Sequence, residues 1–79
     1  MGPGRLGDLA AGKGQYALAL PAYQSVLALK PYDAATAHFK VADTLYRLRR
    51  VEDARMALLQ ALEIAPRFKP ALALLLEMN

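Results

Sequence analysis

YQSVLALKP (residues 23–31) has a counterpart in LLQALEIAP (residues 58–66). The two stretches align without a gap, and each ends in a proline, Pro31 and Pro66, which lie 35 residues apart. Proline disfavours helical backbone in the residue before it, so both stretches are predicted to end a helix. A repeat period of this length is typical of helical hairpins that stack on one another. The sequence therefore predicts a chain built from repeated pairs of α-helices.

Composition supports helices over the whole chain. The 79 residues are 56% hydrophobic, and much of that share is Ala and Leu, the strongest helix formers among apolar residues. Residues with β-branched side chains are few, which disfavours a sheet. A chain of this length forms one domain at most, so we expect a single all-α domain over residues 1–79.

Apolar side chains recur three and four positions apart in five segments of the chain. This spacing places them on one face of a helix, which can then pack on a neighbouring helix. The helices are expected at about residues 4–12, 17–29, 34–48, 52–65 and 69 to the end.

The repeated pattern resembles the tetratricopeptide repeat family, whose unit of about 34 residues follows W-x₂-L-G-x₂-Y…A-x₃-F…P. In both copies, small residues fall where the two helices of a hairpin approach closely, and larger residues fall beside them. The matching positions are Pro3, Leu6, Gly7, Ala10, Ala19, Tyr23 and Pro31 in the first copy, His38, Val41, Ala42, Leu45, Ala54, Leu58 and Pro66 in the second, and Leu72, Leu75 and Leu76 in an incomplete third.

The resemblance implies antiparallel helical hairpins stacked as a short right-handed solenoid of about five helices. Repeat 1 is expected at about residues 1–33, repeat 2 at about 34–67, and a terminal helix at about 68–79. It also implies a non-catalytic module that binds a protein or a peptide, whose identity the sequence leaves open.

The stretch GDLAAGKGQY, from Gly7 to Tyr16, comes close to the phosphate-binding pattern G-x-x-x-x-G-K-[ST]. A phosphate-binding loop needs Ser or Thr after Lys13 and a β-strand before the first glycine. Gly14 follows Lys13 here, and only six residues precede Gly7. The stretch is therefore predicted to form the turn between two helices, where Gly14 can adopt a positive φ at little cost.

The residue inventory gives no catalytic or metal site. Ser25 is the only serine, His38 is the only histidine, and cysteine is absent. Ser25 falls in the middle of an expected helix, without the strand–turn–helix that presents a hydrolase serine. His38 falls where the family packs an apolar residue, and one histidine is too few for a zinc site. We expect no enzyme activity, no cofactor and no metal.

The third expected helix carries a candidate partner-binding face. In the family, the first helices of successive hairpins line a concave groove that holds a partner, and the resemblance assigns this role to six residues of this helix. Tyr and Arg are frequent binding anchors in protein interfaces. The alternative is an ordinary amphipathic helix with Phe39 covered by a neighbour. The candidate residues are Thr36, Phe39, Lys40, Asp43, Tyr46 and Arg47.

A second hypothesis is a structural segment of a larger multi-repeat protein that forms homodimers. The last segment supplies the first helix of a third hairpin, and an uncovered apolar strip at the end of a solenoid normally needs a cap. We expect Leu72, Leu75 and Leu76 to pack on the preceding helices, with Leu74 and Met78 pointing elsewhere. Self-association is assigned to Leu72, Leu74 and Met78.

Charge and targeting signals bound the remaining alternatives. The net charge of +3 is small for a nucleic-acid-binding protein. The stretch RLRRVEDAR could contact phosphates through Arg47, Arg49, Arg50 and Arg55, but acidic residues interrupt it. Nucleic-acid contact is therefore only a third alternative. The first residues do not follow the pattern of a signal peptide, so none is expected. The longest apolar run is far shorter than the ~20 residues that span a bilayer. A cytoplasmic protein without membrane contact is expected.

Overall fold

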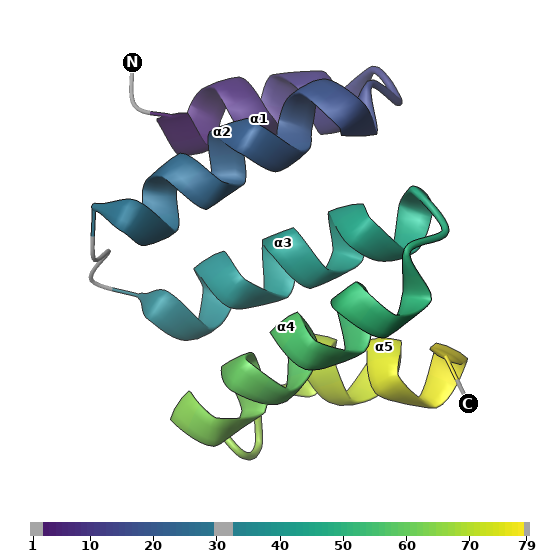
Figure 1. The fold of residues 1–79 in the computed structure, drawn as a ribbon. Coiled ribbons are helices and arrows are strands. Elements are labelled where there is room, and N and C mark those ends of the chain that lie inside the picture. The colour runs from purple at the N-terminus through teal and green to yellow at the C-terminus, as the bar shows by residue number, and fades with distance from the viewer. Residues whose placement is uncertain (1–2, 30–32, 79) are drawn as a thin grey trace.

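The computed structural model describes residues 3–29 and 33–78, and every secondary-structure element in these ranges is an α-helix. The all-α prediction is confirmed, and each predicted helix is present with ends within one residue of those expected. The helices are α1 (Pro3–Gly12), α2 (Tyr16–Ala28), α3 (Ala34–Arg47), α4 (Val51–Ile64) and α5 (Lys69–Met78) (Figure 1).

The helices pack in chain order, as two hairpins followed by one further helix. Helix α1 packs on α2 and α3 on α4, while α2 and α3 join the two hairpins. Helix α5 contacts α4 and, to a smaller extent, α3. The two ends of the chain consequently lie at opposite ends of the stack (Figure 1).

Helix α3 is the centre of the domain because it contacts α2, α4 and α5. Like α4, it contributes to both hydrophobic clusters. One cluster joins α2, α3 and α4, and the other joins α3, α4 and α5. Alanine side chains without exposed surface lie at the helix contacts, which allows the axes to approach closely. The fully buried alanines are Ala19, Ala42, Ala54, Ala61 and Ala71.

Both hairpin turns end their first helix in the same way. After α1, Gly14 has φ +74°, and the Gly14 and Gln15 amides donate to the carbonyls of Ala11 and Ala10 at 3.0 and 2.8 Å. This pattern is a Schellman motif, which needs one residue in the left-handed region. The prediction that Gly14 lies in a turn between two helices is therefore confirmed.

After α3, Arg49 takes the left-handed position, with φ 66°. The Arg49 and Arg50 amides donate to the carbonyls of Tyr46 and Leu45 at 3.0 and 2.9 Å, so the second turn repeats the first. A side chain in this region costs about 1–2 kcal/mol that glycine does not. The two turns thus share one backbone conformation, although its left-handed position holds glycine in the first turn and arginine in the second.

Helix α5 packs through a different face from the one predicted. Ala71 and Leu74 are buried, and Met78 is half-buried against both clusters, so the prediction that Leu74 and Met78 point elsewhere was wrong. Of the three leucines expected to pack, Leu75 does pack against the second cluster. Leu72 and Leu76 do not, since they are 39% and 75% exposed.

Candidate functional site

Six residues of α3 were predicted to bind a partner, and we call them the α3 face: Thr36, Phe39, Lys40, Asp43, Tyr46 and Arg47. Arg47 is exposed and the other five are half-buried. The α3 face therefore combines accessible charge with side chains that also serve the packing of the domain.

Lys40 connects the α3 face to the first hairpin. Its Nζ lies 3.1 and 3.2 Å from the two carboxylate oxygens of Asp8 on α1. The same nitrogen lies 5.6 Å from the ring centroid of Tyr23 on α2, within range of a cation–π contact. One cation thereby joins α1, α2 and α3.

Tyr23 completes this cluster through its hydroxyl, which donates a hydrogen bond of 2.6 Å to Asp8. This hydrogen bond, helped by the adjacent Lys40, lowers the pKa of Asp8 below its usual value despite some desolvation. Burial, and then the Asp8 carboxylate, raise the pKa of the Tyr23 phenol. Asp8 is therefore held as an anion beside a neutral phenol.

From the sequence, Tyr23 is expected to pack between helices, and no role is expected for Asp8. The two residues are 15 positions apart, and Asp8 and Lys40 are 32 positions apart, so no helical spacing links them. Only the stacking of α3 beside the first hairpin brings the three side chains together.

Phe39 lies at the junction between the second hairpin and α5. Its ring meets that of Phe68 edge-to-face, with centroids 5.8 Å apart and planes at 84°. It also packs against the cluster that contains Leu58 and Leu74. Phe39 was predicted to face a partner, and it is half-buried by its neighbours within the chain.

The remaining residues of the α3 face differ in how freely they can meet a partner. Asp43 and Arg47 form an ion pair at 3.5 Å, one helical turn apart, with 37% and 52% of their side chains exposed. Tyr46 packs against both hydrophobic clusters. The Thr36 amide donates to the Asp33 carboxylate at 3.1 Å, so Thr36 belongs to the N-terminal cap of α3.

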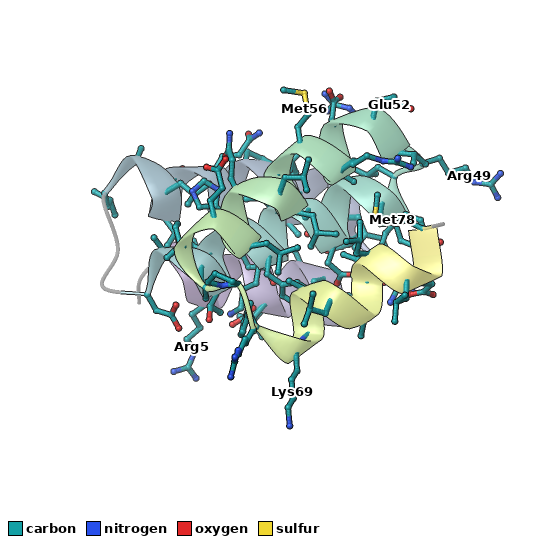
Figure 2. The ribbon with its side chains drawn as sticks, turned by 90° about the horizontal axis from the view of Figure 1, so that it is seen from below. Arg5, Arg49, Glu52, Met56, Lys69 and Met78 are labelled. Carbon is teal, nitrogen blue, oxygen red and sulfur yellow. The ribbon has the colours of Figure 1, made fainter. Side chains whose placement is uncertain are left out.

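The arginines around the second turn do not form a free cationic cluster. Arg47 pairs with Asp43, and Arg50 pairs with Asp53 at 2.8 Å. Arg55 is half-buried, and its Nε is shielded from solvent without a hydrogen-bond partner in the described part of the chain. Arg49 projects away from the domain at this turn (Figure 2). This pattern does not favour the nucleic-acid alternative.

Within residues 3–29 and 33–78, no three His, Cys, Asp or Glu side chains gather in a way that could hold a metal ion. In the same ranges, none of the helices is both long and apolar enough to cross a bilayer.

Comparison with known families matches the tetratricopeptide repeat model over residues 5–70. No curated protein and no solved structure matched the chain. Repeats of this family are generally protein–protein interaction modules and are typically non-catalytic. The matched residues include α2, α3 and α4 in full and most of α1. The paired helices, the repeated turn and the family match agree, and the chain belongs to the tetratricopeptide repeat family.

Proposed function

We propose that this protein binds a peptide or protein partner across the α3 face, without catalysing a reaction. Membership of a family of interaction modules supports a protein partner. The accessible Asp43–Arg47 ion pair on the central helix α3 is the main reason for proposing this surface.

An exposed ion pair can exchange its partner at low cost. Surface pairs contribute only about 0–1 kcal/mol to stability, since water and salt screen them. A partner that offers a carboxylate to Arg47 or a cation to Asp43 therefore displaces little stabilisation when it binds. Tyr46 lies three positions after Asp43, on the same side of α3, and adds a partly accessible ring to this surface.

Charged side chains of the neighbouring helices extend this surface. Arg5 precedes Asp8 by three positions, which places both on one face of α1. In Figure 2, Arg5 and Lys69 project from the same side of the domain, whereas Met56 and Glu52 of α4 project from the opposite side. A partner lying across α1 and α3 would therefore meet the Arg5 cation beside the α3 face, while Lys69 lies farther along, on α5.

The test is selection of peptides from a random displayed library on the immobilised 79-residue chain, followed by affinity measurement on variants. Asp43→Ala/Arg47→Ala removes both members of the ion pair, so the net charge of the protein does not change. We expect this double variant to weaken the selected peptides by about tenfold or more, which is about 1.4 kcal/mol.

The matched control is Arg50→Ala/Asp53→Ala, which removes the other arginine–aspartate pair from the start of α4. It should leave peptide affinity within about twofold of the wild-type value, or about 0.4 kcal/mol. Equal losses in the two double variants, with helicity retained, would refute the α3 face as the binding surface. Phe39→Ala is a poor probe because Phe39 packs on Phe68.

A further inference from the structure

Helix α5 has one face that no described helix covers. Five residues at positions i, i+3, i+4, i+7 and i+8 share this face and are all exposed, and its centre is apolar. Leu76 is the most exposed large hydrophobic residue in the described ranges, at 75%. We call this face the α5 stripe: Lys69, Leu72, Ala73, Leu76 and Glu77.

Comparison with the repeat shows which side of a first helix the α5 stripe corresponds to. A shift of 34 residues places Leu72 and Leu76 on His38 and Ala42 of α3. Ala42 is fully buried, in a cluster with Leu58 of α4. The α5 stripe therefore corresponds to the side of α3 on which the second helix of its hairpin packs.

The residue at the centre of this contact differs in α5. In α1 the corresponding position is Gly7, and a Cβ there would come within 2.6 Å of the Tyr23 ring. In α3 it is Ala42, which has no exposed surface. Leu76 fills the space that the opposing helix occupies in both hairpins. A hairpin helix packed as α2 and α4 are would collide with it, so the α5 stripe suits a different occupant.

The charges of the α5 stripe fit a second copy of the same helix. Lys69 and Glu77 lie four residues before and four residues after Ala73. In an antiparallel pair that crosses at Ala73, each Lys69 faces Glu77 of the other copy. The small side chain of Ala73 lets the helices approach, while Leu72 and Leu76 are covered on both sides of the crossing.

We infer that the chain forms a two-fold symmetric dimer through the α5 stripe. The contact is isologous, because both copies use the same five residues, and it closes at two copies. Ala73, Leu72 and Leu76 supply the apolar contact, and the two Lys69–Glu77 pairs fix the antiparallel register. This inference revises the residues of the predicted self-association surface, since Leu74 is buried within its own chain.

Light scattering on the purified 79-residue chain tests the inference. At about 100 μM, well above a micromolar Kd, the mass should reach twice the 8.6 kDa of one chain. Leu76→Glu places two carboxylates in the apolar contact and should hold the protein at the mass of one chain. A wild-type mass of 8.6 kDa at this concentration, or a doubled mass in Leu76→Glu, would overturn the dimer.

The matched control is Leu18→Glu, which makes the same substitution at a leucine of α2 that is 63% exposed. This variant should dimerise as the wild type does. Circular dichroism of each variant checks that its helices are retained. If Leu18→Glu also abolished the dimer with its helices intact, the contact would not be specific to α5.

Charge reversal tests the antiparallel register. Lys69→Glu brings like charges together at both ends of the contact and should raise the Kd about tenfold at low salt. Lys69→Glu/Glu77→Lys exchanges the two charges and should restore the wild-type Kd. A double variant as weak as the single one would exclude this register. A mass that keeps rising beyond two copies would mean head-to-tail association, for example through the exposed Leu6 and Leu9 of α1, and would overturn the closed dimer.

Discussion

A Cβ atom added at Gly7 would lie 2.6 Å from Cε1 and 2.7 Å from Cδ1 of the Tyr23 ring. Because Gly7 has no side chain, the Tyr23 ring of α2 can lie directly against α1. Tyr23 is only 5% exposed, yet its hydroxyl reaches Asp8, the residue after Gly7. The small residue of the repeat thus serves both the packing of the hairpin and the position of a buried phenol.

Gly7→Ala should lower the free energy of unfolding by about 1 kcal/mol. Forcing an extra methyl group into a packed contact costs about 1–3 kcal/mol, and replacing glycine by alanine inside a helix returns up to about 1 kcal/mol. The collision therefore outweighs the gain in helix propensity. Urea unfolding followed by circular dichroism measures the difference.

Gly12→Ala is the matched control, because a Cβ at Gly12 would meet nothing within 4 Å. This variant should gain up to about 1 kcal/mol from helix propensity alone. Tyr23→Leu should cost less stability in the Gly7→Ala background than in the wild type, since the ring that collides is gone. If Gly7→Ala proved as stable as Gly12→Ala, the close packing of Gly7 on Tyr23 would be wrong.

The hairpins could be predicted from the sequence because the apolar periodicity, the repeated small residues and the turn residues all indicate the same helices. Small residues recur at the repeat period, as Gly7 with Ala42 and Ala19 with Ala54. Pro66 and Gly14 mark the ends of helices. Periodicity and turn chemistry are local properties, so they are legible in one chain. The Asp8–Tyr23–Lys40 cluster is not local, and it depends on how the helices stack.

The face of α5 could not be predicted for a different reason. ALALLLEM is apolar on almost every side, so more than one stripe of residues has the spacing of a helical face. The structure uses the stripe that contains Ala71 and Leu74, with the predicted Leu75 at its edge, and it leaves the predicted Leu72 and Leu76 exposed. Ala71 is fully buried, which shows that close approach to the preceding helices decided the choice.

Introducing glycine at the second turn and removing it from the first should change the free energy of unfolding in opposite directions. Arg49→Gly removes a side chain from the left-handed region, which stabilises the folded state by about 1–2 kcal/mol. Glycine also gives the unfolded chain more conformational freedom, which lowers stability by about 0.5–1 kcal/mol. We expect a net gain of about 0.5–1 kcal/mol in the free energy of unfolding. Gly14→Ala should lose about 1 kcal/mol by the same reasoning. Chemical denaturation of both variants checks the pair, and effects of the same sign would contradict the equivalence of the turns.

Acid should weaken the junction between α1, α2 and α3. The pKa of Asp8 is lowered in the folded protein, chiefly by the Tyr23 hydrogen bond. Its stabilising contribution is therefore present above the unfolded value of 3.8 and is lost as the pH falls through the folded pKa. Asp8→Asn should be less stable than the wild type at pH 7, by up to about 1 kcal/mol for this exposed carboxylate. The difference in stability between the wild type and Asp8→Asn should shrink below pH 3.8. If urea titrations across this range gave a constant difference, the prediction would be contradicted.

Alkali should destabilise the same junction through Tyr23. Burial and the Asp8 carboxylate raise the pKa of this phenol above its usual value of 10.0, so the folded state keeps a proton that the unfolded state releases. The free energy of unfolding therefore falls as the pH rises above 10.0, by at most about 1.4 kcal/mol per pH unit for one proton. Tyr23→Phe loses the hydrogen bond to Asp8 and should be about 1 kcal/mol less stable at pH 7. Its stability should nevertheless decline less steeply in alkali, because it has no phenol to ionise at this site. Denaturant unfolding at a series of pH values measures both slopes, and parallel declines would mean that Tyr23 releases its proton as readily in the folded state as in the unfolded one.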